Sequence, residues 1–190
     1  MIIGITGSIG SGKTTVAKLF KKYGFKIINA DKFYSRIYRK NKSLRRKIKK
    51  EFGTASRNKL KKIVFNNPYE LKKLNKIAHP IIINEIKNEI KKIITNNKNP
   101  KIIIDAPLLL ETKTKNLADN IIVVKGNDKI QIQRLLKKNK YTKQEIRKII
   151  KSQMPLKKKL RYADFVVDNR GSLNEAKKQV DKIIKKIQNI

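Results

Sequence analysis

The stretch from residue 7 to residue 14 reads GSIGSGKT and fits the pattern G-x-x-x-x-G-K-[ST] without a mismatch. It follows an apolar segment typical of a strand and opens a segment with helical spacing, as the pattern requires. Glycines let successive backbone N–H groups curl around phosphate oxygens, and a helix N-terminus adds partial positive charge. The stretch therefore predicts that the chain binds a nucleoside triphosphate; a plain glycine turn that enters a helix is the alternative.

The residue types within this stretch have distinct expected tasks. Lys13 would reach the β- and γ-phosphates, and the Thr14 hydroxyl would bind Mg²⁺. The other expected nucleotide contacts are Ser8, Gly10, Ser11, Gly12 and Thr15. The pattern by itself does not decide whether the phosphate is bound, hydrolysed or transferred.

Sequence signals of other phosphate-binding classes do not fit this chain. A switch GTPase needs D-x-x-G after its metal-binding strand, but Asp105 is followed by Ala106 and Pro107. The segment 124–129, VKGNDK, has the wrong order for a guanine-binding N-K-x-D motif. Motor and helicase classes need chains far longer than 190 residues. A small kinase remains, with a second substrate phosphorylated beneath a lid.

Asp31, in IINADKF, follows the second apolar segment of the chain. A kinase needs a carboxylate that orients the attacking hydroxyl and accepts its proton. Asp is equally favoured as the N-cap of a helix. The residue types and their spacing leave these two roles open.

Five short apolar segments alternate with helical patterns and would position these side chains. Continuous Ile and Val runs suit parallel strands that are covered on both faces. The alternation predicts an α/β P-loop NTPase fold, a five-stranded doubly wound parallel sheet flanked by helices. The expected strands are 1–6, 26–30, 101–105, 120–124 and 164–168.

Helix boundaries are signalled by local residue types. Gly24 is expected to end the helix that starts in the phosphate loop. Asp128 is expected to be the N-cap of another helix, and Ser172 with Glu175 forms a capping box before the last one.

One region breaks the alternation of strands and helices. Residues from about 33 to 98 show only helical patterns and predict a helical insertion on the acceptor side. Residues from about 137 to 160 are strand-free and basic, which predicts a mobile lid. The core of this single unit is then made of 1–32, 99–136 and 161–190.

The formal net charge of +35 invites a nucleic-acid-binding interpretation. Lysine far outnumbers arginine and is spread over the whole chain, whereas base and phosphate readers favour the forked arginine side chain. We therefore expect a solvated basic surface and no specific nucleic acid partner. A basic nucleic-acid-binding NTPase stays as an alternative.

Composition also bounds the environment. No apolar segment reaches the roughly 18 residues of a membrane span, and the N-terminus runs directly into a strand pattern, so neither a membrane nor a leader is expected. The absence of cysteine excludes disulfides and fits a cytoplasmic location. We expect a monomer or a weak homo-oligomer.

Several segments together resemble the dephospho-CoA kinase family over nearly the whole chain. They are GITGSIGSGKTTVA, INAD, IVF, AHPIII, DAPLLLE and QMPLKKKLRYADFVVDN. The resemblance implies ATP- and Mg²⁺-dependent phosphorylation of the ribose 3′-hydroxyl of dephospho-CoA, giving CoA and ADP. It implies that Asp31 is the general base. A nucleoside monophosphate or shikimate-type kinase is the alternative within enzymes.

The resemblance implies further site residues, and each of them also has a purely structural alternative. Asp105 would bind Mg²⁺ or cap its strand. Pro107 and Leu108 would line the acceptor pocket or belong to the core. His79, before a proline suited to the first turn of a helix, would contact substrate or simply pack. Asn169 and Gly171 would wrap the adenine ring or form a turn.

The chain also departs from the family pattern. Arg134 matches a family arginine, but the next one is replaced by Lys138, which keeps the charge and loses the bidentate fork. Stabilisation of the transferring phosphoryl group is then expected from Arg134, Lys138, Lys159 and Arg161, the last two also facing substrate. The connection between Phe52-Gly53 and Arg57 is about eight residues shorter than the resemblance leads one to expect.

Overall fold

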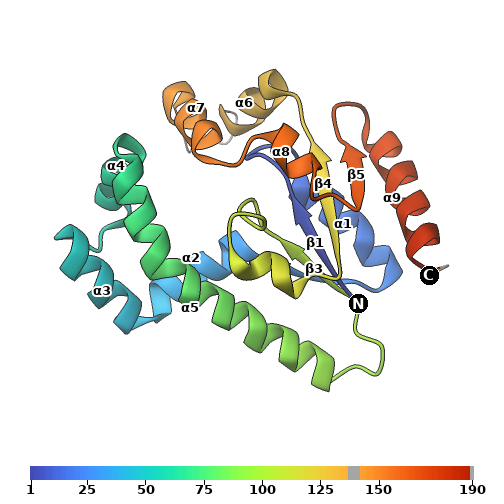
Figure 1. Cartoon of the computed structure of the whole chain (residues 1–190), viewed down its shortest axis with the longest axis horizontal. Helices are drawn as coiled ribbons and strands as arrows, with labels where there is room; N and C mark the ends of the chain where they lie inside the picture. The colour runs from blue at the N-terminus through green and yellow to red at the C-terminus, as the bar shows by residue number, and fades with distance from the viewer. Residues whose placement is uncertain (137–141, 189–190) are drawn as a thin grey trace. The chain divides into compact units, whose positions relative to one another are not determined.

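The computed structural model describes residues 1–136 and 142–188 (Figure 1), so Lys138 lies outside the described residues. The chain forms two compact units. The sheet unit comprises Met1–Asn29 and Ile94–Ile190, and the helical unit comprises Ala30–Ile93. The helical unit covers most of the region in which the sequence predicts a helical insertion. No helix in the described part of the chain is long and apolar enough to cross a membrane.

The five predicted strands are confirmed and form one parallel sheet in the order β2-β3-β1-β4-β5. Asn29 pairs with Asp105 in register, and Ile5 pairs with Asp105 on the other side, so these strands end at the same level. Ligands of open parallel sheets bind beyond this carboxyl edge. The strands are β1 (Ile2–Thr6), β2 (Lys26–Asn29), β3 (Ile102–Asp105), β4 (Asn120–Lys125) and β5 (Phe165–Asp168).

Helices α1 (Lys13–Leu19) and α9 (Leu173–Gln188) pack on one face of the sheet (Figure 1). The helical spacing of apolar residues on α9 gives it a buried stripe, because residues three and four apart share one helix face. Together with β1, these helices enclose the main apolar core. The buried stripe of α9 consists of Ala176, Val180, Ile183, Ile184 and Ile187.

The segment after β3 covers the opposite face of the sheet. Leu109 packs so closely over Gly4 that a Cβ added there would meet its Cδ2 at 2.5 Å. The 3₁₀ helix η2 (Lys113–Leu117) and the short helix α8 (Leu156–Leu160) complete this side. Helices α6 (Asp128–Leu136) and α7 (Lys143–Ser152) lie at the end toward which the strands point (Figure 1).

Two of the predicted helix caps are present and one is shifted. Gly24 adopts a left-handed φ of 83° and ends the 3₁₀ turn η1 (Phe20–Tyr23), which continues α1. Ser172 and Glu175 exchange the two hydrogen bonds of a capping box. The prediction for Asp128 was wrong by one residue: α6 begins at Asp128, and the side chain of the preceding Asn127 accepts from the Lys129 N–H at 2.9 Å.

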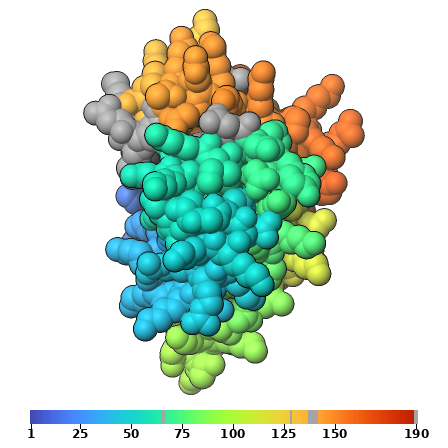
Figure 2. Space-filling model, turned by 90° about the vertical axis from the view of Figure 1, so that its left-hand side faces the viewer, coloured from blue at the N-terminus to red at the C-terminus, as the bar shows by residue number. Residues whose placement is uncertain are grey.

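The helical unit is built from four helices and contains no strand among its described residues. Figure 2 shows its face formed by α3 and α4. His79-Pro80 does not begin a helix as the proline suggests; Pro80 lies inside α5, which tolerates the missing N–H because packing of the long helix outweighs one lost bond. The helices are α2 (Ala30–Lys40), α3 (Lys42–Phe52), α4 (Arg57–Asn66) and α5 (Pro68–Thr95).

The short connection between α3 and α4 is anchored on α2. The Arg57 guanidinium lies over the Tyr38 ring at 5.2 Å and the Tyr34 ring at 5.8 Å, and it donates to Ser35 Oγ at 3.1 Å. The Tyr38 hydroxyl donates to the carbonyl of Ala55 at 2.7 Å. This cluster holds the connection against α2.

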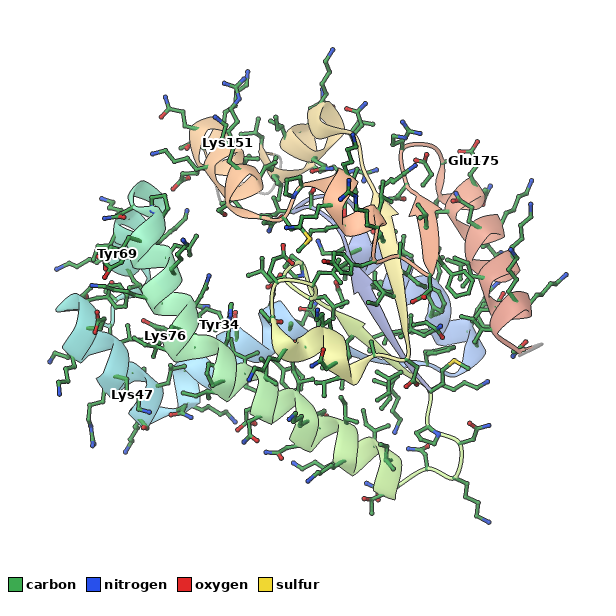
Figure 3. The ribbon with its side chains drawn as sticks, in the orientation of Figure 1. Tyr34, Lys47, Tyr69, Lys76, Lys151 and Glu175 are labelled. Atoms are coloured by element: carbon green, nitrogen blue, oxygen red, sulfur yellow. The ribbon has the colours of Figure 1, made fainter. Side chains whose placement is uncertain are left out.

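Basic charge is spread over both units. Lys47, Lys76 and Lys151 extend outward from α3, α5 and α7, respectively (Figure 3). Among the described ion pairs, only a few acids are available to offset so many cations, as the composition requires.

Tyr34 makes the stability of the helical unit dependent on high pH. Burial raises the pKa of Tyr34 to about 12, with Tyr38 adding to the shift and Arg57 opposing it. The unfolded state ionises near its ordinary value of 10.0 and the folded state does not, so stability falls as pH rises from 10 toward 12. We expect the free energy of unfolding, measured by urea titration, to fall between pH 9 and 11 by about 1 kcal/mol more in the wild type than in Tyr34→Phe.

Tyr69→Phe is the matched control, because Tyr69 is 65% exposed. It should follow the wild type over the same pH range. Parallel curves for the wild type and Tyr34→Phe would show that Tyr34 is not protected from ionisation.

Candidate active site

The phosphate loop between β1 and α1 turns its backbone inward. Gly10 and Gly12 have φ of 79° and 92°, which favour glycine over any L-residue. A Cβ on Gly12 would also overlap the side-chain nitrogen of Asn169. The Ser11 N–H donates to the carbonyl of Ser8 at 3.1 Å, which closes a turn inside the loop. Glycine is thus needed at position 12 for two independent reasons, conformation and space.

Lys13 is 8% exposed, and its ammonium donates to the carbonyl of Ser8 at 3.0 Å. This contact holds the cation over the phosphate loop. Thr14 and Thr15 follow in the first turn of α1 and are exposed. A buried cation beside inward-turned amides is a site for phosphate oxygens.

A buried carboxylate links three elements at the carboxyl edge of the sheet. Asp105 is 1% exposed, and its Oδ2 accepts hydrogen bonds from Thr14 Oγ1 at 2.7 Å and from Asn29 Nδ2 at 2.6 Å. An oxygen pair of this kind suits Mg²⁺, which binds through one or two protein oxygens plus phosphate. No group of three or more His, Cys, Asp or Glu gathers among residues 1–136 and 142–188. Thr14 and Asp105 therefore fit a magnesium ion that is shared with a nucleotide.

Asn169 and Arg134 flank the phosphate loop from the other side. Asn169 is 5% exposed, and its Nδ2 donates to the carbonyl of Ser11 at 2.8 Å. Arg134 of α6 places its Nη1 3.4 Å from the position that a Cβ of Gly12 would take. Gly171, two residues after Asn169, is exposed. The structure thus brings Asn169 and Arg134 to the phosphate loop from residues far along the chain.

Two buried side-chain oxygens in the described part of the chain have no hydrogen-bond partner: Ser11 Oγ and Gln131 Oε1. They are neighbours, because a Cβ on Gly126 would meet Gln131 Nε2 and the Cβ of Ser11 within 3.1 Å. An unsatisfied buried oxygen is costly, so these two oxygens are available as hydrogen-bond acceptors next to the phosphate loop. Sequence reasoning missed Gln131, since a glutamine within a helix carries no signal of its own.

Four of the residues expected to face the acceptor lie in the sheet unit, and two of these, Pro107 and Lys159, are in contact. Pro107 and Leu108 are half-buried, while Arg161 is exposed. Lys159 is fully buried; its ammonium donates to the carbonyl of Pro107 at 2.6 Å and pairs with Glu111 Oε1 at 3.0 Å. Burial lowers the pKa of Lys159, and the Glu111 carboxylate opposes that shift. Lys159 is thus held beside Pro107 and Glu111.

In the helical unit, Asp31 is exposed and is the second residue of α2. It lies in the first turn, where a carboxylate also favours the helix dipole, and it is not the N-cap of that helix. His79 is half-buried within α5.

Sequence reasoning gave no individual role to Asn29, Glu111 or Gln153. Asn29 and Glu111 contact the predicted site residues Asp105 and Lys159, respectively, while Gln153 bonds to Ile9 in the phosphate loop. Asn29 precedes Asp31 by two positions, and Glu111 ends the DAPLLLE segment. Their positions next to singled-out motifs are the signal that could have found them.

Comparison with known proteins gives consistent results. The family model described as dephospho-CoA kinase matches residues 1–175. A dephospho-CoA kinase from Carboxydothermus hydrogenoformans is 38% identical over 193 residues, covering 97% of this chain and 93% of that protein.

Solved structures agree with this result. TT1252 from Thermus thermophilus aligns with a TM-score of 0.79 at 27% identity, covering 97% of this chain and 95% of that one. A dephospho-CoA kinase from Campylobacter jejuni aligns with a TM-score of 0.69 at 27% identity, covering 100% and 98%. The similarity extends over both units of the chain.

Gly12→Ala tests the spatial constraint at the phosphate loop. The added Cβ would displace Asn169 and open the loop, so we expect ATP binding, measured by isothermal titration calorimetry, to be lost. Gly24→Ala is the matched control, because Gly24 has a similar φ of 83° with nothing within 4 Å of an added Cβ. It should cost about 1 kcal/mol of unfolding free energy and leave ATP affinity unchanged. Equal ATP affinity in both variants would contradict the role of this contact.

Proposed function

This chain belongs to the dephospho-CoA kinase family, and we propose that its site transfers the γ-phosphoryl group of ATP to the ribose 3′-hydroxyl of dephospho-CoA. The products are CoA and ADP, which makes this the final step of CoA biosynthesis. The observation that carries the proposal is the phosphate loop with Lys13 buried over it, beside the Thr14–Asp105 pair. The family match over residues 1–175 supports dephospho-CoA as the acceptor.

Phosphoryl transfer needs little covalent chemistry from the protein. The bond between the γ-phosphorus and the β–γ bridging oxygen breaks, and a bond from the ribose 3′-oxygen to that phosphorus forms. The 3′-hydroxyl proton passes to the carboxylate of Asp31, which acts as general base. The loop amides and Lys13 hold the triphosphate while ADP leaves.

The position of Asp31 in the chain supports its proposed role. It comes two residues after Asn29, whose side chain is bonded to Asp105. The covalent chain holds the Cα atoms of Asn29 and Asp31 within about 7 Å of each other. This short covalent connection to a residue of the Asp105 hydrogen-bond network is what supports the proposed role of Asp31.

Thr14 and Asp105 are the proposed ligands of Mg²⁺. When bound, the ion would neutralise charge on the phosphate oxygens. Asn29 donates to the same Asp105 oxygen and so fixes the orientation of this carboxylate.

Cationic side chains are proposed to stabilise the transferring phosphoryl group. Arg134 lies against Gly12, so its guanidinium is available at the phosphate loop. Lys138 and Arg161 remain proposed contacts of the phosphoryl group or the substrate. Lys159 is proposed to act at the acceptor side with Pro107, whose carbonyl it binds.

The remaining assignments extend this proposal. Ser8, Ser11 and Thr15 would bind phosphates, and Asn169 with Gly171 would border the adenine. Leu108 and His79 would contact dephospho-CoA. We propose that about 33–98 is the acceptor-side insertion and that the remaining residues outside about 137–160 form the kinase core. Within the expected lid at about 137–160, we propose that only the part before residue 153 moves, because residues 153–159 are bonded to the sheet unit.

Other functions are less well supported. A nucleoside monophosphate or shikimate-type kinase does not fit the family match, and the even spread of lysine does not favour a nucleic acid partner. We propose a cytoplasmic enzyme that acts as a monomer or a weak homo-oligomer, without a membrane.

An acceptor screen tests the proposed reaction. In a coupled assay for ADP release at 0.15 M salt, we expect turnover with dephospho-CoA. Turnover with AMP, CMP or shikimate should be at least about 100-fold lower, because these molecules lack groups through which dephospho-CoA would be bound. RNA and DNA should not stimulate ATP hydrolysis. Turnover confined to AMP, CMP or shikimate would overturn the assignment, and stimulation by nucleic acid would favour the NTPase alternative.

Asp31→Asn tests the general base. We expect kcat to fall by roughly 10²–10⁴ with little change in ATP affinity, because the amide cannot accept the proton. Glu70→Gln is the matched control, since Glu70 is an acid in the first turn of α5. It should keep its activity. If the two variants have the same kcat, Asp31 only stabilises the first turn of its helix.

A further inference from the structure

The chain between α7 and the end of α8 bonds to two loops at the carboxyl edge of the sheet. Gln153 Oε1 accepts from the N–H of Ile9 in the phosphate loop at 3.0 Å. The next residue, Met154, donates its N–H to Glu111 Oε1 at 2.9 Å. Lys159 donates to the carbonyl of Pro107 at 2.6 Å. We refer to residues 153–159 as the brace.

The contact with Ile9 supports the phosphate loop from outside and adds to the bonds that Ser11 and Lys13 make to the Ser8 carbonyl within it. Glycines make this loop conformationally free, so its shape must be imposed from outside. Asn169 holds the carbonyl of Ser11, and Gln153 holds the N–H of Ile9, 144 residues away in sequence. Two amide side chains thus fix two backbone groups of one loop.

Gln153 is itself held in place, because the brace is anchored by the buried ammonium of Lys159, which pairs with the partly exposed Glu111. Lys159 is fully buried, and its ammonium lies 3.0 Å from Glu111 Oε1 and 3.4 Å from Thr6 Oγ1. A buried ammonium is costly unless its partners are well placed, so this arrangement tolerates little displacement. Glu111 also holds Met154, which joins the anchor directly to Gln153.

We propose that Gln153 is a positioning residue that sets the phosphate loop in its nucleotide-binding shape. Through the brace, the loop is fixed to the 107–111 segment, which the proposed function places on the acceptor side. Gln153 acts through the Ile9 amide and need not touch a substrate. The inference concerns ATP affinity, and only its acceptor-side consequence rests on the proposed function.

Gln153→Met tests this role, because methionine has a similar length and no strong acceptor. We expect the Ile9 amide to exchange with solvent about tenfold faster in ¹⁵N-labelled protein without nucleotide. We expect the KM for ATP to rise by about tenfold, while the KM for dephospho-CoA stays within about twofold. A rise in the KM for ATP without a rise in the KM for dephospho-CoA distinguishes loop positioning from a general loss of activity.

Two further variants keep the test decisive. Gln153→Glu retains an acceptor oxygen and should restore slow exchange at Ile9. Gln133→Met, an exposed glutamine on α6, should change neither exchange nor KM.

Unchanged exchange at Ile9, or faster exchange with an unchanged KM for ATP, would overturn the proposal. So would faster exchange throughout β1 with a lower melting temperature, because that result indicates a purely structural contact. Neither amide exchange at Ile9 nor ADP binding, measured by calorimetry, requires an acceptor substrate. If the wild type fails to phosphorylate dephospho-CoA, the proposed function fails while these readouts still judge Gln153.

Discussion

A phosphate loop must turn its amides toward the ligand, and its outward backbone groups then need partners elsewhere. In this protein those partners come from the second half of the chain. Asn169 binds the carbonyl of Ser11, and Gln153 binds the N–H of Ile9. The local motif is therefore completed only when the residue after β5 and the segment before α8 have packed against the phosphate loop. This dependence ties nucleotide binding to the fold of the whole sheet unit.

The strand order explains where the reactive groups meet. Because β3 lies between β2 and β1, Asp105 stands beside Asn29 and within hydrogen-bond distance of Thr14. The chain leaves β2 at this same edge to enter the helical unit, with Asp31 in its first turn. One topological choice thus brings the proposed metal ligands Thr14 and Asp105 to one edge of the sheet.

A buried charge supports the acceptor side of this edge. Lys159 is shielded from water while its partner Glu111 is partly exposed, and burial by itself would favour the neutral amine of Lys159. The carboxylate and the Pro107 carbonyl compensate for lost hydration. Such a pair is a poor source of net stability but a strict geometric constraint, since moving either partner leaves a charge uncompensated.

The sequence by itself determined the elements with strong local signals. The five strands, the phosphate loop, the Ser172–Glu175 capping box and the all-helical region after β2 follow from periodicity and residue type, which act over a few positions. Cap positions were less certain, as Asn127 shows, because neighbouring polar residues compete for the same amides. Pro80 was misjudged since tertiary packing outweighs a local preference.

Only the tertiary structure decided which distant side chains meet. The roles of Asn29, Gln131 and Gln153 arise from contacts over many residues, for which a single sequence carries no local signal. The same holds for Lys159, where sequence gives a basic residue and the fold makes it a buried anchor. Local patterns reflect short-range conformational preferences, whereas these contacts depend on strand order and on the desolvation that packing imposes.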